Sequence, residues 1–222
     1  MKVVAAYLLA VLGGNDGLVS NFSLVMGIAG ATSGQSEVLL AGMAGLLAGA
    51  LSMAAGEYVS VSSQTDVEKA DIEREKQELE EMPELELQRL ATIYEERGLK
   101  KETALLVAKE LTVHDALGAH VRDELGINEI SQANPLQAAL ASGAAFTVGG
   151  VLPLLVVLFF PFDYLEYALY VFAILFLGIM GGLAAKTGGS NVLKAILRIT
   201  FWGTIAMGLS SLVGHLFGVQ VA

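Results

Sequence analysis

Five long apolar stretches constrain the fold of this chain more than any other feature. They cover about residues 3–31, 38–61, 136–160, 164–185 and 192–219. Each is long enough to cross a hydrocarbon core about 30 Å thick, which takes roughly 20 residues of helix. The chain has 222 residues, of which 54% are hydrophobic, and a mean hydropathy of +0.61. This predicts an all-α membrane protein with five transmembrane helices.

Composition and missing motifs exclude several function classes. The chain has no cysteine, which excludes a disulfide framework, a thiolate metal site and a thiol nucleophile. A net charge of −10 argues against binding of nucleic acid. No GxGxxG, P-loop or nucleophile motif occurs, so we expect neither an enzyme nor a prosthetic group. The first apolar stretch has one Lys and no small-residue cleavage site, so we interpret it as part of the mature protein.

An acidic segment separates the second and third apolar stretches. Residues 62–134 hold 18 of the 23 acidic and nine of the 13 basic residues, a net charge of −9. The segment opens with a long run free of Gly and Pro; Pro83 then begins a second helix that Gly98 ends. One or two more helices follow, and an inward face is expected to include Leu105, Leu106, Ala108, Leu111 and Leu117.

We therefore expect three parts in the chain. Residues 1–61 form transmembrane helices 1 and 2, residues 62–134 form an inserted cytoplasmic helical metal-binding domain, and residues 135–222 form transmembrane helices 3 to 5.

The cations predict the orientation in the membrane. With five spans, all 13 Lys and Arg fall on one side: Lys2, the nine of the acidic segment, Lys186, Lys194 and Arg198. The positive-inside rule puts that side, with the N-terminus and the acidic domain, in the cytoplasm and the C-terminus outside. Because no targeting segment is evident, we favour a prokaryotic plasma membrane over a vacuolar membrane.

The stretch "NDGLVSNFSLVMG" places Asp16 inside the first predicted span. A carboxylate at that depth costs roughly 3 kcal/mol and usually lines a polar pathway. An alternative is that "GGND" interrupts the span and that Asp16 caps the second half of a broken helix. Both interpretations can hold together, because broken helices often mark transport sites.

The second span carries a row of four residues on one helical face. Gly45, Gly49, Met53 and Glu57 follow one another at intervals of four. The glycines allow close approach of another helix. We predict that Met53 and Glu57 line a translocation path with Asp16. The alternatives are that Met53 fills a core or lipid-facing position and that Glu57 lies at the membrane interface.

The acidic domain contains a row of carboxylates on one helix face, namely Asp71, Glu75 and Glu78. Like charges at this spacing repel, and cationic side chains or a divalent metal can offset the repulsion. A solvated face with ion pairs is the alternative.

Two carboxylate–imidazole pairs follow further along. Glu110 and His114 are four residues apart, as are His120 and Glu124. Pairs at this spacing can chelate a transition metal from one helix. Oxygen ligands with imidazole and a thioether suit Fe²⁺ or Mn²⁺ better than Cu⁺ or Ca²⁺. His215, in the fifth span, is isolated, and we interpret it as a satisfied polar group rather than a ligand.

Three motifs resemble the vacuolar iron transporter family, including its bacterial and nodulin-like members. They are "DGLVSNFSLVMGIAGA", "AGALSMAAGEYVSVSSQ" and "HDALGAHVRDELGI". The order of two spans, an acidic domain and three spans also matches. The resemblance implies a homodimer with a path at the dimer interface that exports Fe²⁺, and often Mn²⁺, in exchange for protons, with Zn²⁺ as an in vitro substitute.

The resemblance also assigns residues. It matches Asp16 and Met53 to the family's membrane ligands. It matches the family's cytoplasmic metal-binding glutamates to Glu75, Glu78, Glu86 and Glu124.

Departures from the family pattern concern both regions. Gly45 stands where plant-type members have a Glu, which leaves the proton coupling open, and Glu57 is a partial substitute. Arg89 stands where they have an acidic residue, and His120 and Val121 where they have a Met pair.

Two other classes of function compete with a proton-coupled transporter. The first is a membrane-anchored metal-binding or sensing protein without transport. A mere anchor has no use for Asp16 or a broken span, which argues against it. The second is a di-iron oxidase, which would need Glu and His three residues apart, whereas these pairs are four apart.

Overall fold

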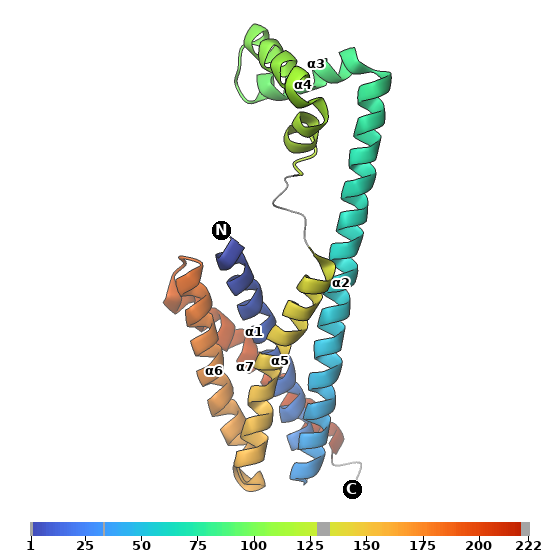
Figure 1. The fold of residues 1–222 in the computed structure, drawn as a ribbon. Helices are drawn as coiled ribbons and strands as arrows, with labels where there is room; N and C mark the ends of the chain where they lie inside the picture. Colours follow the sequence, from blue (N-terminus) through green and yellow to red (C-terminus); the bar gives the residue numbers. More distant parts are fainter. Residues whose placement is uncertain (1, 33, 128–133, 219–222) are drawn as a thin grey trace. The chain divides into compact units, whose positions relative to one another are not determined.

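The computed structural model describes residues 2–32, 34–127 and 134–218, and for residues 2–10 and 12 it describes the backbone alone. The described secondary structure is helical and contains no strand (Figure 1), which confirms the all-α prediction. The elements are α1 (Lys2–Ala31), α2 (Gln35–Glu81), α3 (Pro83–Glu96), α4 (Lys101–Asp123), α5 (Pro135–Phe159), η2 (Phe162–Tyr164), α6 (Leu165–Thr187) and α7 (Val192–Gly218).

The chain forms two compact units, each of which is described by itself. The membrane unit comprises Met1–Tyr58 and Leu136–Ala222, and the acidic unit comprises Val59–Pro135. Helix α2 contributes to both, because no Gly or Pro occurs between Gly56 and Pro83 to end it. The second predicted span and the first helix of the acidic segment are therefore one continuous helix of 47 residues.

Four helical segments among the described residues are long and apolar enough to cross a membrane. They are α2, α5, the segment Phe162–Thr187 and α7. The first predicted span corresponds to α1, a helix of 30 residues. The count of five spans stays a prediction.

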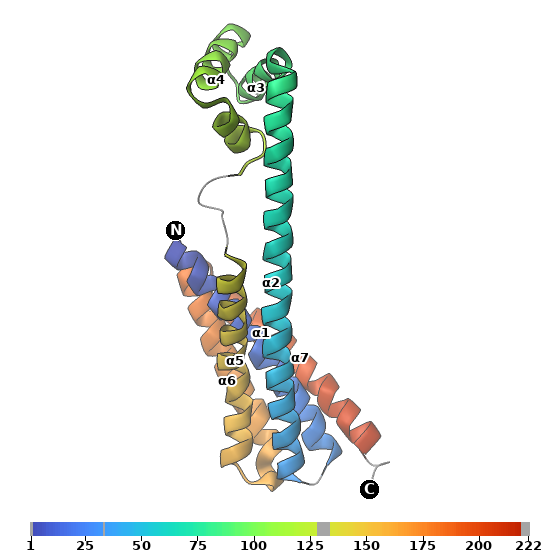
Figure 2. The ribbon, with the colours of Figure 1, turned by 45° about the vertical axis from the view of Figure 1, so that its right-hand side comes forward.

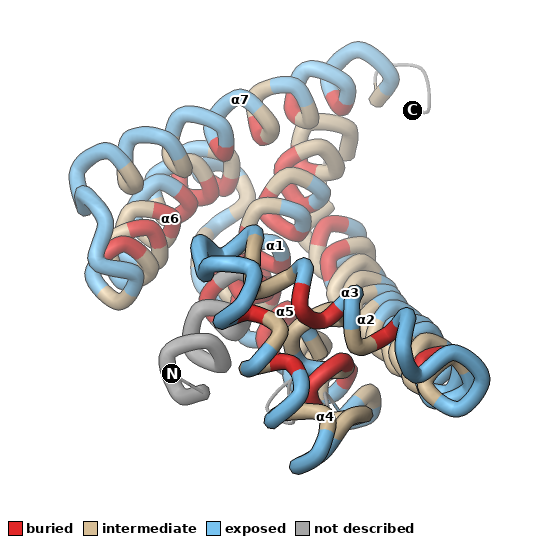
Figure 3. Tube along the Cα trace, turned by 90° about the horizontal axis from the view of Figure 1, so that it is seen from above, coloured by how far each residue is buried: buried red, intermediate tan, exposed pale blue. Residues whose placement is uncertain are grey.

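The membrane unit has its core along α1, which packs on α6 and α7. Leu18, Phe22, Val25 and Met26 of α1 are completely buried. In Figure 3 the buried residues of α6 and α7 lie on the sides that face the rest of the membrane unit. Large apolar side chains such as Trp202 point outward, which is the arrangement expected where lipid covers the helices.

Helix α1 runs without a break through the four residues of "GGND", so the broken-helix interpretation of Asp16 is wrong. The glycines of this region serve packing instead. A Cβ on Gly13 would lie 2.8 Å from the Cβ of Ala145, and one on Gly17 would collide with the carbonyl oxygen of Phe146. Close approach of α5, which lies beside α1 and the first part of α2 (Figure 2), explains the small residues.

In the acidic unit, α3 packs on α4 around buried Leu90, Ala91, Ala108 and Ala119. Of the predicted inward face, Leu106 is an exception, because it is 57% exposed. Helix α4 consists of two segments that meet at Asp115, whose backbone is non-helical (φ −162°, ψ 88°). The Asp115 carboxylate accepts a hydrogen bond of 3.0 Å from the N–H of Gly118 and so caps the second segment.

The contact of α1 with α5 makes a testable prediction. Gly17→Ala should lower the free energy of unfolding by about 1–3 kcal/mol, because the added Cβ meets backbone that cannot rotate away. Thermal unfolding in detergent should then show a Tm lower by roughly 2–10 °C.

The matched control is Gly56→Ala in α2, where an added Cβ meets nothing within 4 Å. Its Tm should stay the same or rise, because Ala favours helix over Gly. Equal Tm values for the two variants would contradict the assigned helix contact.

Candidate metal centre

Four side chains from three helices meet inside the acidic unit. They are Glu75 of α2, Glu86 of α3, and His120 and Glu124 at the end of α4. One ligand-capable atom from each lies within 4.8 Å of all the others. We call these four residues the acidic cluster.

Local sequence places each member of the acidic cluster. Glu75 lies on the long uninterrupted part of α2. Glu86 lies in the first turn of α3, which Pro83 begins, and its N–H donates to the Met82 carbonyl oxygen. His120 and Glu124 are one turn apart, and the N–H of Glu124 donates to the His120 carbonyl oxygen at 2.9 Å.

The imidazole of His120 is the centre of the acidic cluster. Its Nδ1 lies 2.8 Å from Oε1 of Glu75, 2.9 Å from Oε2 of Glu124 and 3.9 Å from Oε2 of Glu86. A single ring nitrogen carries at most one proton, so it can donate to only one carboxylate at a time. The other carboxylates face it without a shared hydrogen.

Burial makes this arrangement unusual. The side chains of His120 and Glu86 are completely buried, and that of Glu75 is 4% exposed. Oε1 of Glu75, Oε1 of Glu86 and Nε2 of His120 are buried and lack a hydrogen-bond partner. Buried groups of this kind are costly unless a partner satisfies them. A bound cation would satisfy the carboxylate oxygens.

Arg89 of α3 supplies part of the missing positive charge. Its Nη1 lies 2.9 Å from Glu78, 3.1 Å from Glu86 and 3.4 Å from Glu124. Because Arg89 also pairs with Glu78, this one guanidinium offsets only part of the negative charge of the carboxylates around it. A bound divalent cation would offset more of it.

The surroundings shift the pKa of Glu75. Burial raises the pKa above its ordinary value of 4.5, and the negative charge of Glu124 raises it further, against the opposing effect of His120. Glu75 therefore gives up its proton less readily than an exposed glutamate does. Metal binding, which needs the ionised form, should release a proton there.

A second network fixes the end of α4 beside Glu124. Asp123 accepts hydrogen bonds from Arg97 at 2.7 Å, from Arg122 at 3.0 Å and from the Tyr94 hydroxyl at 3.0 Å. Burial raises the pKa of Asp123, but these hydrogen bonds lower it more, and the net direction is downward. The ionised carboxylate ties α4 to the end of α3 and so positions Glu124.

The membrane unit holds an open pocket of about 250 Å³ that both polar and apolar residues line. Asp16 and Met53 both line it, with Asn21 and Phe146 among their neighbours. Asn21 is buried and donates to the Gly150 carbonyl oxygen at 2.6 Å, while its own Oδ1 lacks a partner. Carboxylate, amide and thioether groups thus line one pocket that opens at the surface of the membrane unit, where Asp16 is exposed.

A sequence profile of the VIT family matches residues 9–215. The chain belongs to the VIT family. A vacuolar iron transporter of Acanthamoeba castellanii is 45% identical over 207 residues, which cover 93% of this chain and 76% of that protein. Vacuolar iron transporter homolog 4 of Arabidopsis thaliana is 34% identical over 92% of this chain and 82% of its own length. Vacuolar iron transporter homolog 5 of Oryza sativa subsp. japonica is 35% identical over 94% of this chain and 78% of its own length.

In this VIT family member the predicted cytoplasmic residues fall into three groups. The acidic cluster brings together Glu75, Glu86, His120 and Glu124, and Glu78 lies at its edge through Arg89. Asp71 lies apart, in an exposed ion pair of 2.6 Å with Arg74.

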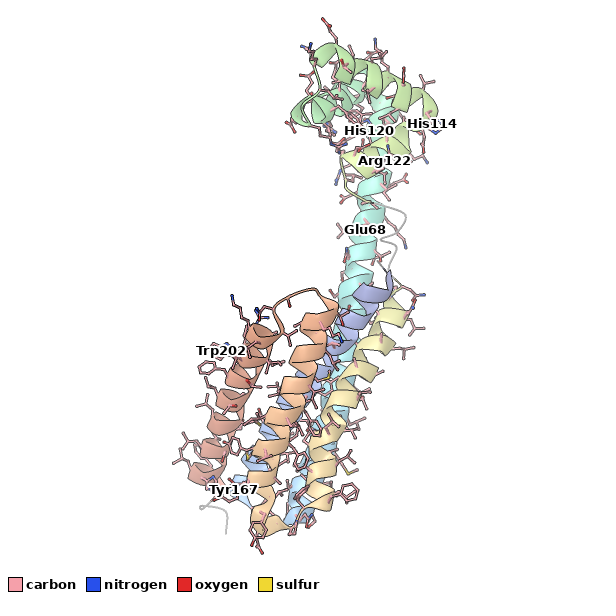
Figure 4. All side chains as sticks on the ribbon, turned by 90° about the vertical axis from the view of Figure 1, so that its left-hand side faces the viewer. Glu68, His114, His120, Arg122, Tyr167 and Trp202 are labelled. Atoms are coloured by element: carbon pink, nitrogen blue, oxygen red, sulfur yellow. The ribbon has the colours of Figure 1, made fainter. Side chains whose placement is uncertain are left out.

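Glu110 and His114 form the third group. Both are exposed on the first segment of α4, on the other side of the Asp115 kink from His120. In Figure 4 His114 lies at one side of the unit, next to the kink in α4, whereas His120, which is completely buried, lies nearer the middle. The structure therefore forms one of the two predicted pairs, His120 with Glu124, as a close contact of 2.9 Å.

Of the predicted membrane residues, Asp16 and Met53 share the cavity and Glu57 does not line it. Sequence reasoning missed Asn21, Arg89 as an ion-pair partner, and the network around Asp123. The signals were present only in part: Asn21 follows Asp16 within the same apolar stretch, and Arg89 follows Glu86 by one helical turn.

The raised pKa of Glu75 predicts how stability depends on pH. Between pH 4.5 and the raised pKa, the folded metal-free protein binds more protons than the unfolded chain does, so stability falls as pH rises through that window. Glu75→Gln cannot ionise, so this variant lacks the fall in stability with rising pH. Its Tm relative to wild type, measured with a chelator present, should therefore increase as pH rises from 4.5.

Glu110→Gln, an exposed carboxylate outside the acidic cluster, is the control and should follow wild type across the same range. A Tm difference between Glu75→Gln and wild type that is independent of pH would contradict the burial effect.

Proposed function

We propose that this VIT family member exports divalent metal, Fe²⁺ and also Mn²⁺, from the cytosol in exchange for protons, as a homodimer. The acidic cluster is the observation that carries the proposal. Three carboxylates around one imidazole, with buried oxygens that lack partners, suit a divalent transition metal. The relatives' names, which are those of iron transporters, support iron as the cargo and a transporter rather than an enzyme.

The donor set supports the choice of metal. Oxygen ligands with one imidazole suit Fe²⁺ and Mn²⁺, whereas Ca²⁺ takes oxygen ligands alone and Cu⁺ favours sulfur. We assign Glu75, Glu86, His120 and Glu124 as the ligands that collect the ion. Zn²⁺ should bind the same donors in vitro.

The cavity of the membrane unit supports transport over anchoring. Asp16 offers a fixed negative charge and Met53 a soft thioether to an ion that has shed water. We infer that the Asp16 carboxylate carries metal in one direction and a proton in the other. We assign Glu57 to the same path, beyond the cavity that Asp16 and Met53 line.

Two exposed features support a homodimer. Asp16 is exposed at the surface of the isolated membrane unit, and the row Leu40, Leu47 and Leu51 of α2 is 62–70% exposed. A second copy would cover apolar helix surface and enclose the carboxylate. The orientation with the acidic unit in the cytoplasm, in a plasma membrane or a eukaryotic vacuolar membrane, is part of this proposal.

Flux measurements test the transport step. In proteoliposomes with an imposed pH gradient, the wild type should move Fe²⁺ and Mn²⁺, and Asp16→Asn should reduce the rate by at least tenfold, because the charge that replaces the hydration shell is gone.

Glu37→Gln, an exposed carboxylate of α2 outside the Asp16 cavity, is the matched control and should keep the wild-type rate. If Asp16→Asn moved metal at the wild-type rate and with the wild-type pH dependence, the antiport mechanism would be wrong. If wild type moved no metal while the acidic unit still bound it, the function would be metal sensing instead.

Binding measurements test the acidic cluster. His120→Gln in the full-length protein should weaken the tightest Mn²⁺ site by about 10–100-fold, as is typical when a metal ligand or its close support is lost. Isothermal titration would measure this.

His114→Gln removes an exposed imidazole from the same helix and should leave the affinity unchanged. If both substitutions had equal effects, the cluster would not be the tight site.

A further inference from the structure

A second pair of donor groups lies in the membrane unit, far along the chain from the acidic cluster. Glu166 is in the first turn of α6, and His215 is in the last turn of α7. Nε2 of His215 lies 3.6 Å from Oε1 of Glu166. This is the end of the membrane unit that carries η2 and Tyr167, which is labelled in Figure 4.

The hydrogen bonds of His215 determine which ring nitrogen carries the proton. Its Nδ1 lies 2.9 Å from the carbonyl oxygen of Ser211, which can only accept. Nδ1 is therefore the N–H donor, and in the neutral ring Nε2 has a free lone pair. That lone pair faces the Glu166 carboxylate. Two acceptors at this distance attract each other only with a cation between them.

Neighbouring residues fix the positions of the Glu166 carboxylate and the His215 ring. The Ser211 hydroxyl donates to Oε2 of Glu166 at 3.5 Å, which leaves Oε1 toward the imidazole. The ring of His215 packs on Gly30 of α1, where a Cβ would lie 2.7 Å from Nδ1. Histidine ligands usually donate their second ring N–H to a backbone carbonyl or carboxylate, as His215 does.

Space and access are also present. Glu166 and His215 open into a cavity of about 420 Å³ that Asp163, Tyr167 and Tyr170 also line. The side chain of His215 is 57% exposed and that of Glu166 is 35% exposed. A partly hydrated ion can therefore reach the pair, with water and the nearby oxygens completing its coordination.

We propose that Glu166 and His215 form a weak second site for a divalent transition-metal ion at the η2 end of the membrane unit. The Nε2 lone pair of His215 and Oε1 of Glu166 would be the two protein donors to that ion. One imidazole with one carboxylate favours Mn²⁺ or Fe²⁺ over Ca²⁺. The assignment of this site as the place where exported metal leaves rests on the proposed function; the binding itself does not.

Mn²⁺ binding to the full-length protein in lipid nanodiscs tests this site. The chain has three histidines, so in a His114→Gln/His120→Gln background His215 is the only imidazole. Pulsed EPR should then still show ¹⁴N coupling to bound Mn²⁺. Adding His215→Gln should abolish the coupling, and excess Ca²⁺ should leave it intact. Glu166→Gln should weaken the affinity for Mn²⁺ at this site at least tenfold.

Two further variants complete the test. Gly30→Ala keeps both ligands but displaces the ring, and it should weaken Mn²⁺ binding even if Glu166→Gln folds poorly. Glu37→Gln, an exposed carboxylate at the start of α2 with no imidazole facing it, should have no effect.

The outcomes separate this proposal from the transport function. Absence of ¹⁴N coupling in the background, or no response to Glu166→Gln and Gly30→Ala, would overturn it and leave a simple His–Glu ion pair. Bound Mn²⁺ at His215 in a protein that moves no metal would support the site and refute transport. Metal flux in a protein that binds no Mn²⁺ at His215 would support transport and refute this site.

Discussion

The acidic unit brings several carboxylates together in a buried place, and its other polar contacts offset part of this negative charge. Glu75, Glu86 and Glu124 surround one imidazole where water does not reach two of the side chains. Arg89 offsets part of the charge, and the network around Asp123 connects α4 to the end of α3. The remaining negative charge makes this part of the unit compatible with a bound divalent ion.

The membrane unit deals with polar groups by a different means. Its helices approach at glycines, so that Gly17 of α1 lies on the backbone of α5 near Phe146, and the polar side chains are left to line cavities. Asp16 and Met53 share one cavity, and Glu166 and His215 share another. Ionisable side chains in membrane proteins usually pair with one another or line polar cavities, as these do.

Parts of this picture follow from local sequence. The i, i+4 spacing of His120 and Glu124 predicts their contact, and the apolar lengths predict the spanning helices. Local patterns also misled: "GGND" has the composition of a helix break, yet α1 is continuous because the glycines meet a neighbouring helix. Glu110 and His114 have the same spacing as His120 and Glu124, but the kink at Asp115 separates the two pairs.

The sequence by itself determined the helical class, the apolar segments, the charge of the acidic segment and, through its motifs, the family resemblance. These depend on residues near one another in the chain. Only the tertiary structure decided that Glu75, Glu86 and His120 meet, that Arg89 bridges Glu78, Glu86 and Glu124, and that Glu166 faces His215. Apart from Arg89 with Glu86, which lie one turn apart in α3, these contacts join different helices. The crossing of helices is set by packing between residues that lie far apart in the sequence.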